Sequence, residues 1–143
     1  MRTTNDLLNV LNSEVKNESD LDSYIERIDE YQDLDYISYF EYIRTRHGTK
    51  KNTIAKSSGI SRTYCYQMMN GSRRPGRDNA ISLAIAAGFT LEETLRYLEL
   101  LEEGILYAKN KRDALIIYSI SHKSSVSETN ELLYSKGEKT LGE

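Results

Sequence analysis

The residue types best suited to chemistry gather between Gly59 and Arg77, in the stretch GISRTYCYQMMNGSRRPGR. This stretch holds the only cysteine of the 143-residue chain, together with four arginines and no acidic residue. A cysteine can act as a nucleophile or a redox sensor when it is accessible and its thiol ionises readily. An arginine carries five N–H donors in a planar fork that matches the oxygens of a phosphate. The stretch therefore raises two alternatives, thiol chemistry or the binding of a negatively charged partner.

The elements that must position these residues follow from the apolar spacing on either side of Gly59. Two short helices are predicted, at about residues 50–58 and 61–69, with only Gly59 and Ile60 between them. Glycine accepts the positive φ of a sharp turn, and Ser61 can accept a hydrogen bond from a free N–H group where the second helix starts. Two helices joined by a tight glycine turn form a helix-turn-helix unit.

The second of these helices divides into a buried face and an exposed face. Helical spacing assigns four residues to the buried face: Ile60, Tyr64, Cys65 and Met68. Four residues remain on the exposed face: Arg62, Thr63, Tyr66 and Gln67. Arginine can bond guanine through two donors, glutamine can bond adenine, and threonine can touch a thymine methyl group. The exposed residues are therefore the predicted base contacts, and the cysteine is predicted to be a core residue rather than a nucleophile.

The charges of the chain are strongly segregated, although the net charge is only −3. Nine basic residues and no acidic residue lie between Arg44 and Arg77, whereas Met1 to Asp35 holds ten acidic and three basic residues. A local block of this kind indicates a surface for a polyanion, and the alternative is a basic surface that has no partner. The predicted phosphate contacts are Lys50, Lys51, Ser61, Asn70, Arg73, Arg74 and Arg77.

The same stretch resembles the helix-turn-helix of the lambda-repressor-like group, of the Cro/C1 or XRE type. The residues that carry the resemblance, in order, are Ala55, Gly59, Ile60, Ser61, Asn70, Gly71, Arg74 and Pro75. The resemblance covers roughly residues 35–100 and implies an all-α domain of five helices, in which Arg62, Thr63 and Gln67 read bases. Three residues depart from the pattern: Lys51, where the group often has a phosphate-contacting glutamine, Cys65 and Tyr66.

The second half of the chain contains a weak internal repeat. A shift of 35 residues places the segment 77–98 on the segment 112–133 without a gap, and the dipeptide Arg-Asp begins both. Thr90 and Glu93 form the pattern of a helix-starting capping box, and Ser125 and Glu128 repeat it. The repeat indicates a duplicated helix hairpin and favours a helix over a buried strand for the apolar run DALIIYSI, unless the similarity is due to chance.

Three domains are predicted along the chain. Residues 1–33 form an acidic helical extension, residues 34–104 form the helix-turn-helix domain, and residues 105–143 form a C-terminal helix hairpin that provides a dimer or partner surface. A first domain helix is expected to end near His47 and Gly48. We expect His47 to cap that helix or lie in a solvated loop rather than bind a phosphate. The tyrosines at helical spacing, Tyr39, Tyr97, Tyr118 and Tyr134, are expected in the core or in an interface.

Several classes of protein are not expected from this sequence. We find no phosphate-cradling glycine loop, no serine, histidine and aspartate set, and no metal motif, so we expect no catalytic residue, no metal and no cofactor. The start of the chain lacks the apolar region of a signal peptide, and the longest apolar run is too short to cross a bilayer. One unpaired cysteine fits a reducing compartment, so the predicted location is the cytoplasm, away from membranes.

Two functions remain open at the level of the sequence. The first is a sequence-specific transcriptional regulator, repressor-like and dimeric, that binds double-stranded DNA with the helix 61–69. The second is an adaptor, antitoxin or phage-derived inhibitor that uses the same basic face on RNA or on an acidic protein. The second explains the acidic residues 1–33 better, and these residues could also fold over the basic face and inhibit it.

Overall fold

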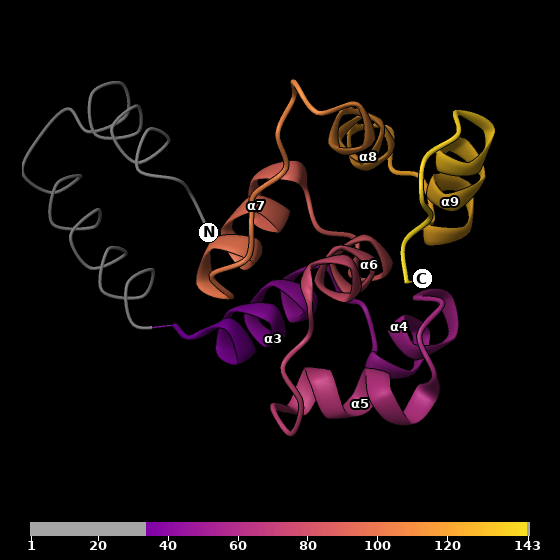
Figure 1. Cartoon of the computed structure of the whole chain (residues 1–143). Coiled ribbons are helices and arrows are strands. Elements are labelled where there is room, and N and C mark those ends of the chain that lie inside the picture. The colour runs from indigo at the N-terminus through magenta and orange to yellow at the C-terminus, as the bar shows by residue number, and fades with distance from the viewer. Residues whose placement is uncertain (1–33, 143) are drawn as a thin grey trace, which may run out of the picture.

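The structure of the chain is a computed structural model that describes residues 34–142, and within this range it is built from helices alone (Figure 1). The helices are α3 (Tyr36–Arg46), α4 (Lys51–Ser57), α5 (Arg62–Asn70), α6 (Arg77–Ala87), α7 (Leu91–Leu100), α8 (Lys111–Ser121) and α9 (Val126–Ser135). The predicted all-α class and the predicted C-terminal helix hairpin are confirmed. The extension predicted for residues 1–33 lies outside the described residues, and the domain boundaries at residues 33 and 104 stay predictions.

The helices begin and end where short polar side chains and glycines were expected. Thr90 and Ser125 each accept a bond from the backbone N–H of a glutamate three residues on, and that glutamate bonds back, so both predicted capping boxes are present. The Oγ atom of Ser61 accepts from the N–H of Tyr64 at the start of α5. His47 is the C-cap residue of α3, as expected from the sequence. Local hydrogen bonding therefore sets most of the helix boundaries.

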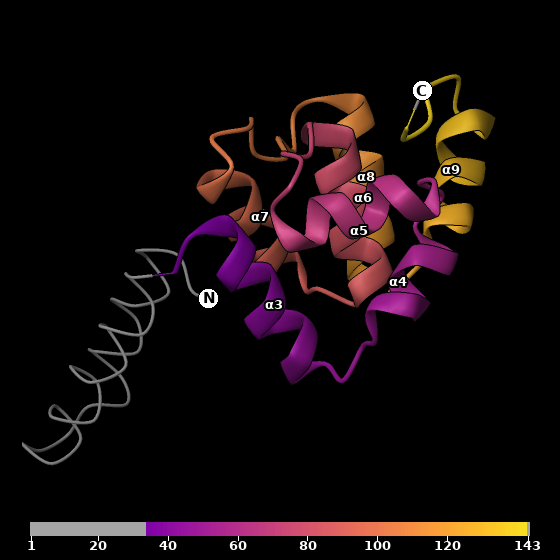
Figure 2. The ribbon, with the colours of Figure 1, turned by 90° about the horizontal axis from the view of Figure 1, so that it is seen from below.

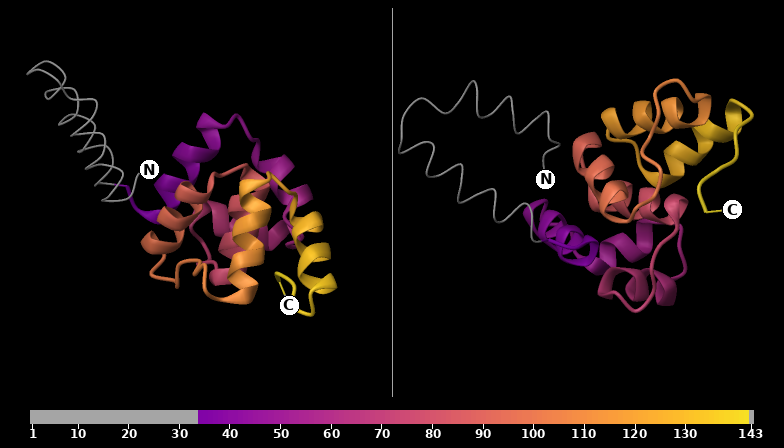
Figure 3. Two further views of the ribbon diagram at one scale, coloured as in Figure 1. Left: turned by 90° about the horizontal axis from the view of Figure 1, so that it is seen from above. Right: turned by 60° about the vertical axis from the view of Figure 1, so that its left-hand side comes forward.

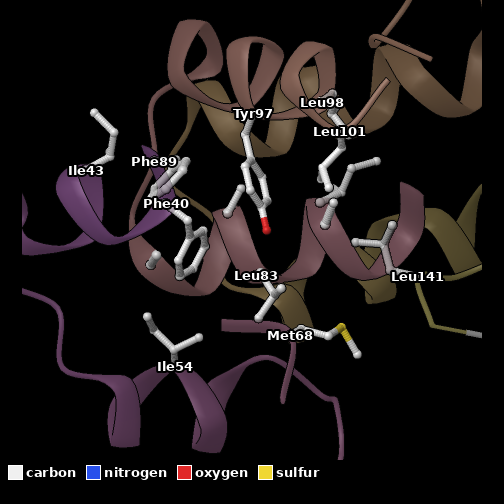
Figure 4. Packing of buried hydrophobic residues seen from close by; sticks show 14 of the residues in the cluster. Phe40, Ile43, Ile54, Met68, Leu83, Phe89, Tyr97, Leu98, Leu101 and Leu141 are labelled. Atoms are coloured by element: carbon white, nitrogen blue, oxygen red, sulfur yellow. The ribbon is translucent and has the colours of Figure 1, made fainter. Parts of the chain in front are cut away.

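The core lies around α6, which runs through the centre of the molecule (Figure 1). Six of its eleven residues are buried, as expected for a helix that other helices cover on several sides. Figure 4 shows Phe40 and Phe89 beside Tyr97, with ring centroids 5.1–6.0 Å apart. Such aromatic pairs contribute about 0.5–1.5 kcal/mol each beyond the area that they bury. Burial raises the pKa of the Tyr97 hydroxyl, which therefore stays protonated.

The 35-residue repeat is visible in the backbone. α6 and α7 correspond to α8 and α9, and the turn within each pair is closed by the same two hydrogen bonds. In the first turn Gly88 N bonds Ile85 O and Phe89 N bonds Ala84 O, and the bonds 35 residues on join Lys123 to Ile120 and Ser124 to Ser119. Gly88 and Lys123 share a positive φ, of 83° and 57°. The predicted repeat is thus a repeat of structure, and the run DALIIYSI is helical, as the repeat indicated.

Reciprocal ion pairs join the two halves of the repeat. Arg77 Nη2 lies 2.8 Å from Asp113 Oδ2, and Arg112 Nη2 lies 2.9 Å from Asp78 Oδ2. The arginine of each half therefore forms an ion pair with the aspartate of the other half. The helix contacts follow the same exchange, since α6 contacts α9 and α7 contacts α8. The two hairpins therefore pack against each other reciprocally: the first helix of each contacts the second helix of the other.

The C-terminal hairpin also touches the helix-turn-helix unit. Figure 3 shows α8 and α9 side by side, and Val126 at the start of α9 lies near Gly59 in the turn between α4 and α5. A side-chain carbon placed on Gly59 would lie 3.8 Å from Val126 Cγ1, and Val126 is 4 % exposed. Ile116, Leu133 and Leu141 join the same apolar cluster as Tyr39 and Phe40. Across residues 34–142, no helix is long and apolar enough to cross a membrane.

Candidate nucleic-acid interface

The turn between α4 and α5 is tight and well bonded. Gly59 has a φ of +75°, the conformation that glycine adopts without strain. Ser58, the C-cap of α4, is 1 % exposed, and its Oγ accepts from the N–H of Ile60 at 3.2 Å. Ile54 and Ala55 are buried on α4, so this helix packs closely against its neighbours. α4, the turn and α5 therefore have the predicted helix-turn-helix arrangement.

α5 buries a narrower face than the spacing predicted. Cys65, Met68 and Met69 are buried, but Tyr64 is 43 % exposed, so the prediction that Tyr64 faces inward is wrong. The reason is local: the ring of Tyr64 lies against the guanidinium of Arg73 at the surface, with 4.2 Å between the guanidinium carbon and the ring centroid. An amphipathic tyrosine is stable in such a position.

The predicted base contacts all belong to α5, which Figure 2 shows from below. Arg62 and Thr63 are exposed, whereas Tyr66 and Gln67 are half-buried. Tyr66 packs against the core cluster with part of its ring. All four come from one short helix, so the structure brings them together on one surface. Whether they touch bases stays a prediction.

Arg62 is held by two neighbours. Its Nη1 donates to Asn52 Oδ1 of α4 at 2.9 Å, and its guanidinium carbon lies 5.1 Å from the centroid of the Tyr66 ring. Asn52 is a residue of this surface that the sequence pattern does not predict. Its position one residue into α4 offered no signal by itself, because the contact depends on how α4 and α5 cross.

Cys65 is a core residue, as predicted. It is fully buried, and Ser58 Oγ lies 3.8 Å from its sulfur. Burial raises the pKa of the Cys65 thiol, although the hydrogen bond from Ser58 partly opposes the effect. A buried thiol that resists ionisation is a poor nucleophile. The structure therefore excludes Cys65 from the exposed chemistry of the stretch.

The loop after α5 is shaped by its own hydrogen bonds. Asn70 Oδ1 accepts from the N–H and the hydroxyl of Ser72, at 3.1 and 2.8 Å. The N–H of Arg73 bonds Gln67 O at 3.1 Å, which folds the loop back onto α5. Asn70 and Arg73, two of the predicted phosphate contacts, are exposed. The loop thereby presents basic side chains next to the outer face of α5.

Arg74 and Arg77 have partners inside the protein. Arg74 lies over the Tyr36 ring at 5.2 Å and donates to the carbonyl of Leu101, yet the residue is exposed. Arg77 Nε donates to Gly104 O at 2.7 Å, and its Nη2 donates to Asp113. These bonds favour a structural role for Arg77, and the phosphate contact predicted for it stays a prediction.

The start of α4 carries the remaining predicted phosphate contacts. Lys50 is exposed at the N-cap position, and no side chain caps the helix there. Lys51 follows as the first helical residue, and its Nζ lies 3.9 Å from Glu41 Oε2, a loose contact at the surface. Ser61 is exposed at the start of α5. Two helix starts on one surface add partial positive charge to the lysines, which suits an anionic partner.

His47 binds a carboxylate in this structure. Its Nε2 lies 2.8 Å from Glu93 Oε1 of α7, which links the end of α3 to the capping box at Thr90. Burial acts to raise the pKa of Glu93, but the bonds from the Thr90 N–H and from His47 outweigh it, and the pKa is lowered. The cap predicted for His47 is confirmed. Its bond to Glu93, 46 residues away, was not foreseen.

A short helix, a tight glycine turn and a second helix with an exposed polar face define a helix-turn-helix protein. In line with this class, residues 40–93 match the family model described as helix-turn-helix. The match makes this segment similar to the lambda-repressor-like helix-turn-helix domains of the Cro/C1 type, the XRE family, which are DNA-binding regulatory domains, and it covers less than half of the chain. α8 and α9 lie beyond the matched residues. Comparison with curated proteins and with solved structures found no match for the chain.

Proposed function

We propose that the chain is a sequence-specific transcriptional regulator, repressor-like in its action, that places α5 in the major groove of double-stranded DNA. The observation that carries the proposal is the row formed by the exposed Arg62 and Thr63 and the half-buried Gln67 on the second helix of a helix-turn-helix domain. Arginine and glutamine are side chains that distinguish bases by paired hydrogen bonds. In a regulator of this kind we propose no catalytic role for any residue, and we propose that it acts in the cytoplasm.

Phosphate contacts are proposed for the residues around α5. Lys50 and Lys51 precede or begin α4, and Arg73 and Arg74 follow α5 in the chain. Lysine and arginine contacts to phosphates release counterions, so they supply much of the affinity and make it depend on salt. Each phosphate contact adds about 0.9 to the steepness of log K against log salt. We expect Arg73→Ala to reduce this steepness by about that amount.

The experiment that tests the proposal is a selection of bound fragments from random DNA, followed by titration at two salt concentrations. The wild type is expected to prefer the selected site over unrelated DNA. Arg62→Ala with Gln67→Ala is expected to lose discrimination worth about 1–3 kcal/mol for each base contact. Lys109→Ala is the control, because Lys109 is an exposed basic residue outside the helix-turn-helix unit, in the connection between α7 and α8.

Two results would sink the proposal. One is the absence of DNA binding even at low salt. The other is full discrimination after Arg62 and Gln67 have both been replaced. Preferential binding of RNA or of an acidic protein in the same titration would favour the adaptor function instead.

We also propose that residues 105–143 provide a dimer or partner surface. Tyr107, Tyr118 and Tyr134 are 63, 54 and 81 % exposed, which is high for aromatic side chains. Large exposed aromatic residues are enriched where proteins associate. Helix-turn-helix proteins commonly bind as dimers to half-sites about one helical turn apart. Sedimentation with and without DNA tests this, and a monomer bound to a single half-site is the contrary result.

A further inference from the structure

The basic block contains an unusual concentration of arginines stacked on tyrosines. Four guanidinium carbons lie 4.2–5.6 Å from a tyrosine centroid, in the pairs Arg46–Tyr42, Arg62–Tyr66, Arg73–Tyr64 and Arg74–Tyr36. Such contacts occur about once per 70–80 residues, so residues 34–142 would hold about one or two at the usual frequency. All four lie between residues 36 and 74, the part of the chain that builds the candidate interface. The pairing is therefore a feature of this surface.

The first pair of interest fixes the arginine that begins α5. Tyr66 lies one helical turn after Arg62 and is anchored by its contact with the core cluster. Asn52 accepts a bond from Nη1 of the same guanidinium. The group is thus held by a ring on one side and by an amide from α4 on another. Arginine has five N–H donors, and the bond to Asn52 uses one of them.

The second pair fixes an arginine in the loop after α5. Arg73 stacks on Tyr64 at 4.2 Å, the shortest of the four distances. The backbone of Arg73 is tied to α5 through its bond to Gln67. Both residues are exposed, so the stack lies at the surface where a phosphate would approach. The Tyr64 ring therefore holds the Arg73 guanidinium in one orientation, which the loop alone would not fix.

We propose that Tyr64 and Tyr66 are positioning residues, which hold the guanidinium groups of Arg73 and Arg62 in the orientation that DNA requires. The inference rests on the proposed function, since it assigns the arginines to a phosphate and to a base. A long arginine side chain loses conformational freedom when it binds, and a side chain already held by a ring loses less. The ring of each tyrosine, rather than its hydroxyl, is the part that acts.

The alternative is that stacking on the tyrosine ring opposes DNA binding, and this alternative gives the inference a clear test. If an arginine had to leave its ring to reach DNA, the stack would compete with binding. Removing the ring would then strengthen binding rather than weaken it. The sign of the change in affinity therefore separates the two relations.

The experiment for Tyr66 compares binding to the selected site with binding to a site that carries a substituted base. Tyr66→Phe, which keeps the ring, should keep the ratio of the two dissociation constants within about two-fold of the wild type. Tyr66→Leu, which keeps apolar bulk, should reduce the ratio about 5–10-fold, at the low end of the about 5–160-fold that one bidentate base contact provides. Adding Tyr66→Leu to Arg62→Ala should change nothing further. The ratio does not depend on the fraction of folded protein, so partial unfolding of the leucine variant does not mimic the effect.

The experiment for Tyr64 measures affinity and its salt dependence in single variants and in the double variant with Arg73→Ala, where a loss of folding would still weaken binding but a lost stack would not. Tyr64→Leu should weaken binding several-fold to every DNA sequence and leave the salt slope unchanged, because the number of charges is the same. Tyr64→Phe should bind like the wild type. Arg73→Ala should lower the slope, and Tyr64→Leu should have no effect in that background.

The inference is overturned if either leucine variant binds as well as the wild type, or more tightly, while the arginine variants lose affinity or discrimination. It is also overturned if Tyr66→Phe alone abolishes discrimination, because the hydroxyl would then be a direct base contact. If Arg62→Ala and Arg73→Ala themselves change nothing, the proposed function of this surface fails, and the role of the tyrosines fails with it.

Discussion

Gly71 ends α5 and lies close to α3, so this one residue affects how α5 packs. Gly71 has a φ of +91° and ends α5, and a Cβ atom there would lie 2.6 Å from Ile37 Cδ1 of α3. Only glycine combines this backbone conformation with so close an approach. The Ile37 side chain of α3 therefore packs closely over the residue that ends α5. The end of α5 is therefore held by backbone geometry.

We predict that Gly71→Ala destabilises the protein by at least about 1 kcal/mol, the cost of the left-handed conformation for alanine. Displacement of Ile37 adds to this cost. Gly48→Ala is the matched control, because Gly48 has a φ of +72° and nothing within 4 Å of a Cβ position. Urea unfolding of the two variants measures the difference. Equal losses would mean that Ile37 moves aside freely and that the contact does not hold α5.

Residue-scale prediction from the sequence was accurate for Cys65 and wrong for Tyr64. Both lie on α5 at spacings compatible with a buried face, but Cys65 is fully buried whereas Tyr64 is 43 % exposed. The partner of Tyr64 is Arg73, which follows a turn and returns toward the helix. Helical periodicity carries no information about a contact made across such a turn.

At the scale of elements, capping signals predicted the helix boundaries well because they act within a few residues. The capping box at Thr90 is one example, and its glutamate has a second role that local pattern does not contain. Glu93 also bonds His47, so one carboxylate ties the start of α7 to the end of α3. Contacts between elements of this kind depend on how the helices pack.

We predict that Glu93→Gln makes the free energy of unfolding depend less on pH at acidic pH. The bonds to Glu93 lower its pKa in the folded protein below the ordinary value of 4.5. As the pH falls below 4.5, the unfolded chain takes up this proton first, so stability is lost as the pH falls toward the folded pKa. Glutamine can keep the capping bond but cannot ionise. Urea unfolding between pH 3 and 7 should show the two proteins converging as the pH falls, and parallel curves would contradict the prediction.

At the scale of the whole molecule, the repeat was foreseen but its pairing was not. The sequence aligns the dipeptides Arg77-Asp78 and Arg112-Asp113, yet it predicts a phosphate contact for Arg77. Its partner Asp113 lies 36 residues away, and only the packing of one hairpin on the other brings the two together. A sequence repeat shows that two hairpins are alike, and it leaves open the way in which they meet.

We predict that the two reciprocal ion pairs contribute unequally to stability. The Asp113 side chain is 9 % exposed and also accepts from the N–H of Tyr107 at 2.9 Å, whereas the Asp78 side chain is 27 % exposed. Asp113→Ala removes a buried carboxylate and leaves both the Arg77 guanidinium and the N–H of Tyr107 without it, so it should cost about 3 kcal/mol. Asp78→Ala, its matched control in the other half of the repeat, should cost about 1 kcal/mol because the Asp78 carboxylate is more exposed to water.

Both variants should still unfold in a single transition, because residues from α8 and α9 share one apolar cluster with α3 and α6. Urea unfolding followed by circular dichroism and by tyrosine fluorescence measures the two costs and tests for a single transition. Equal losses would show that burial does not distinguish the pairs. Two separate transitions in Asp113→Ala would show that the C-terminal hairpin folds apart from the helix-turn-helix domain, which would support the predicted boundary at residue 104.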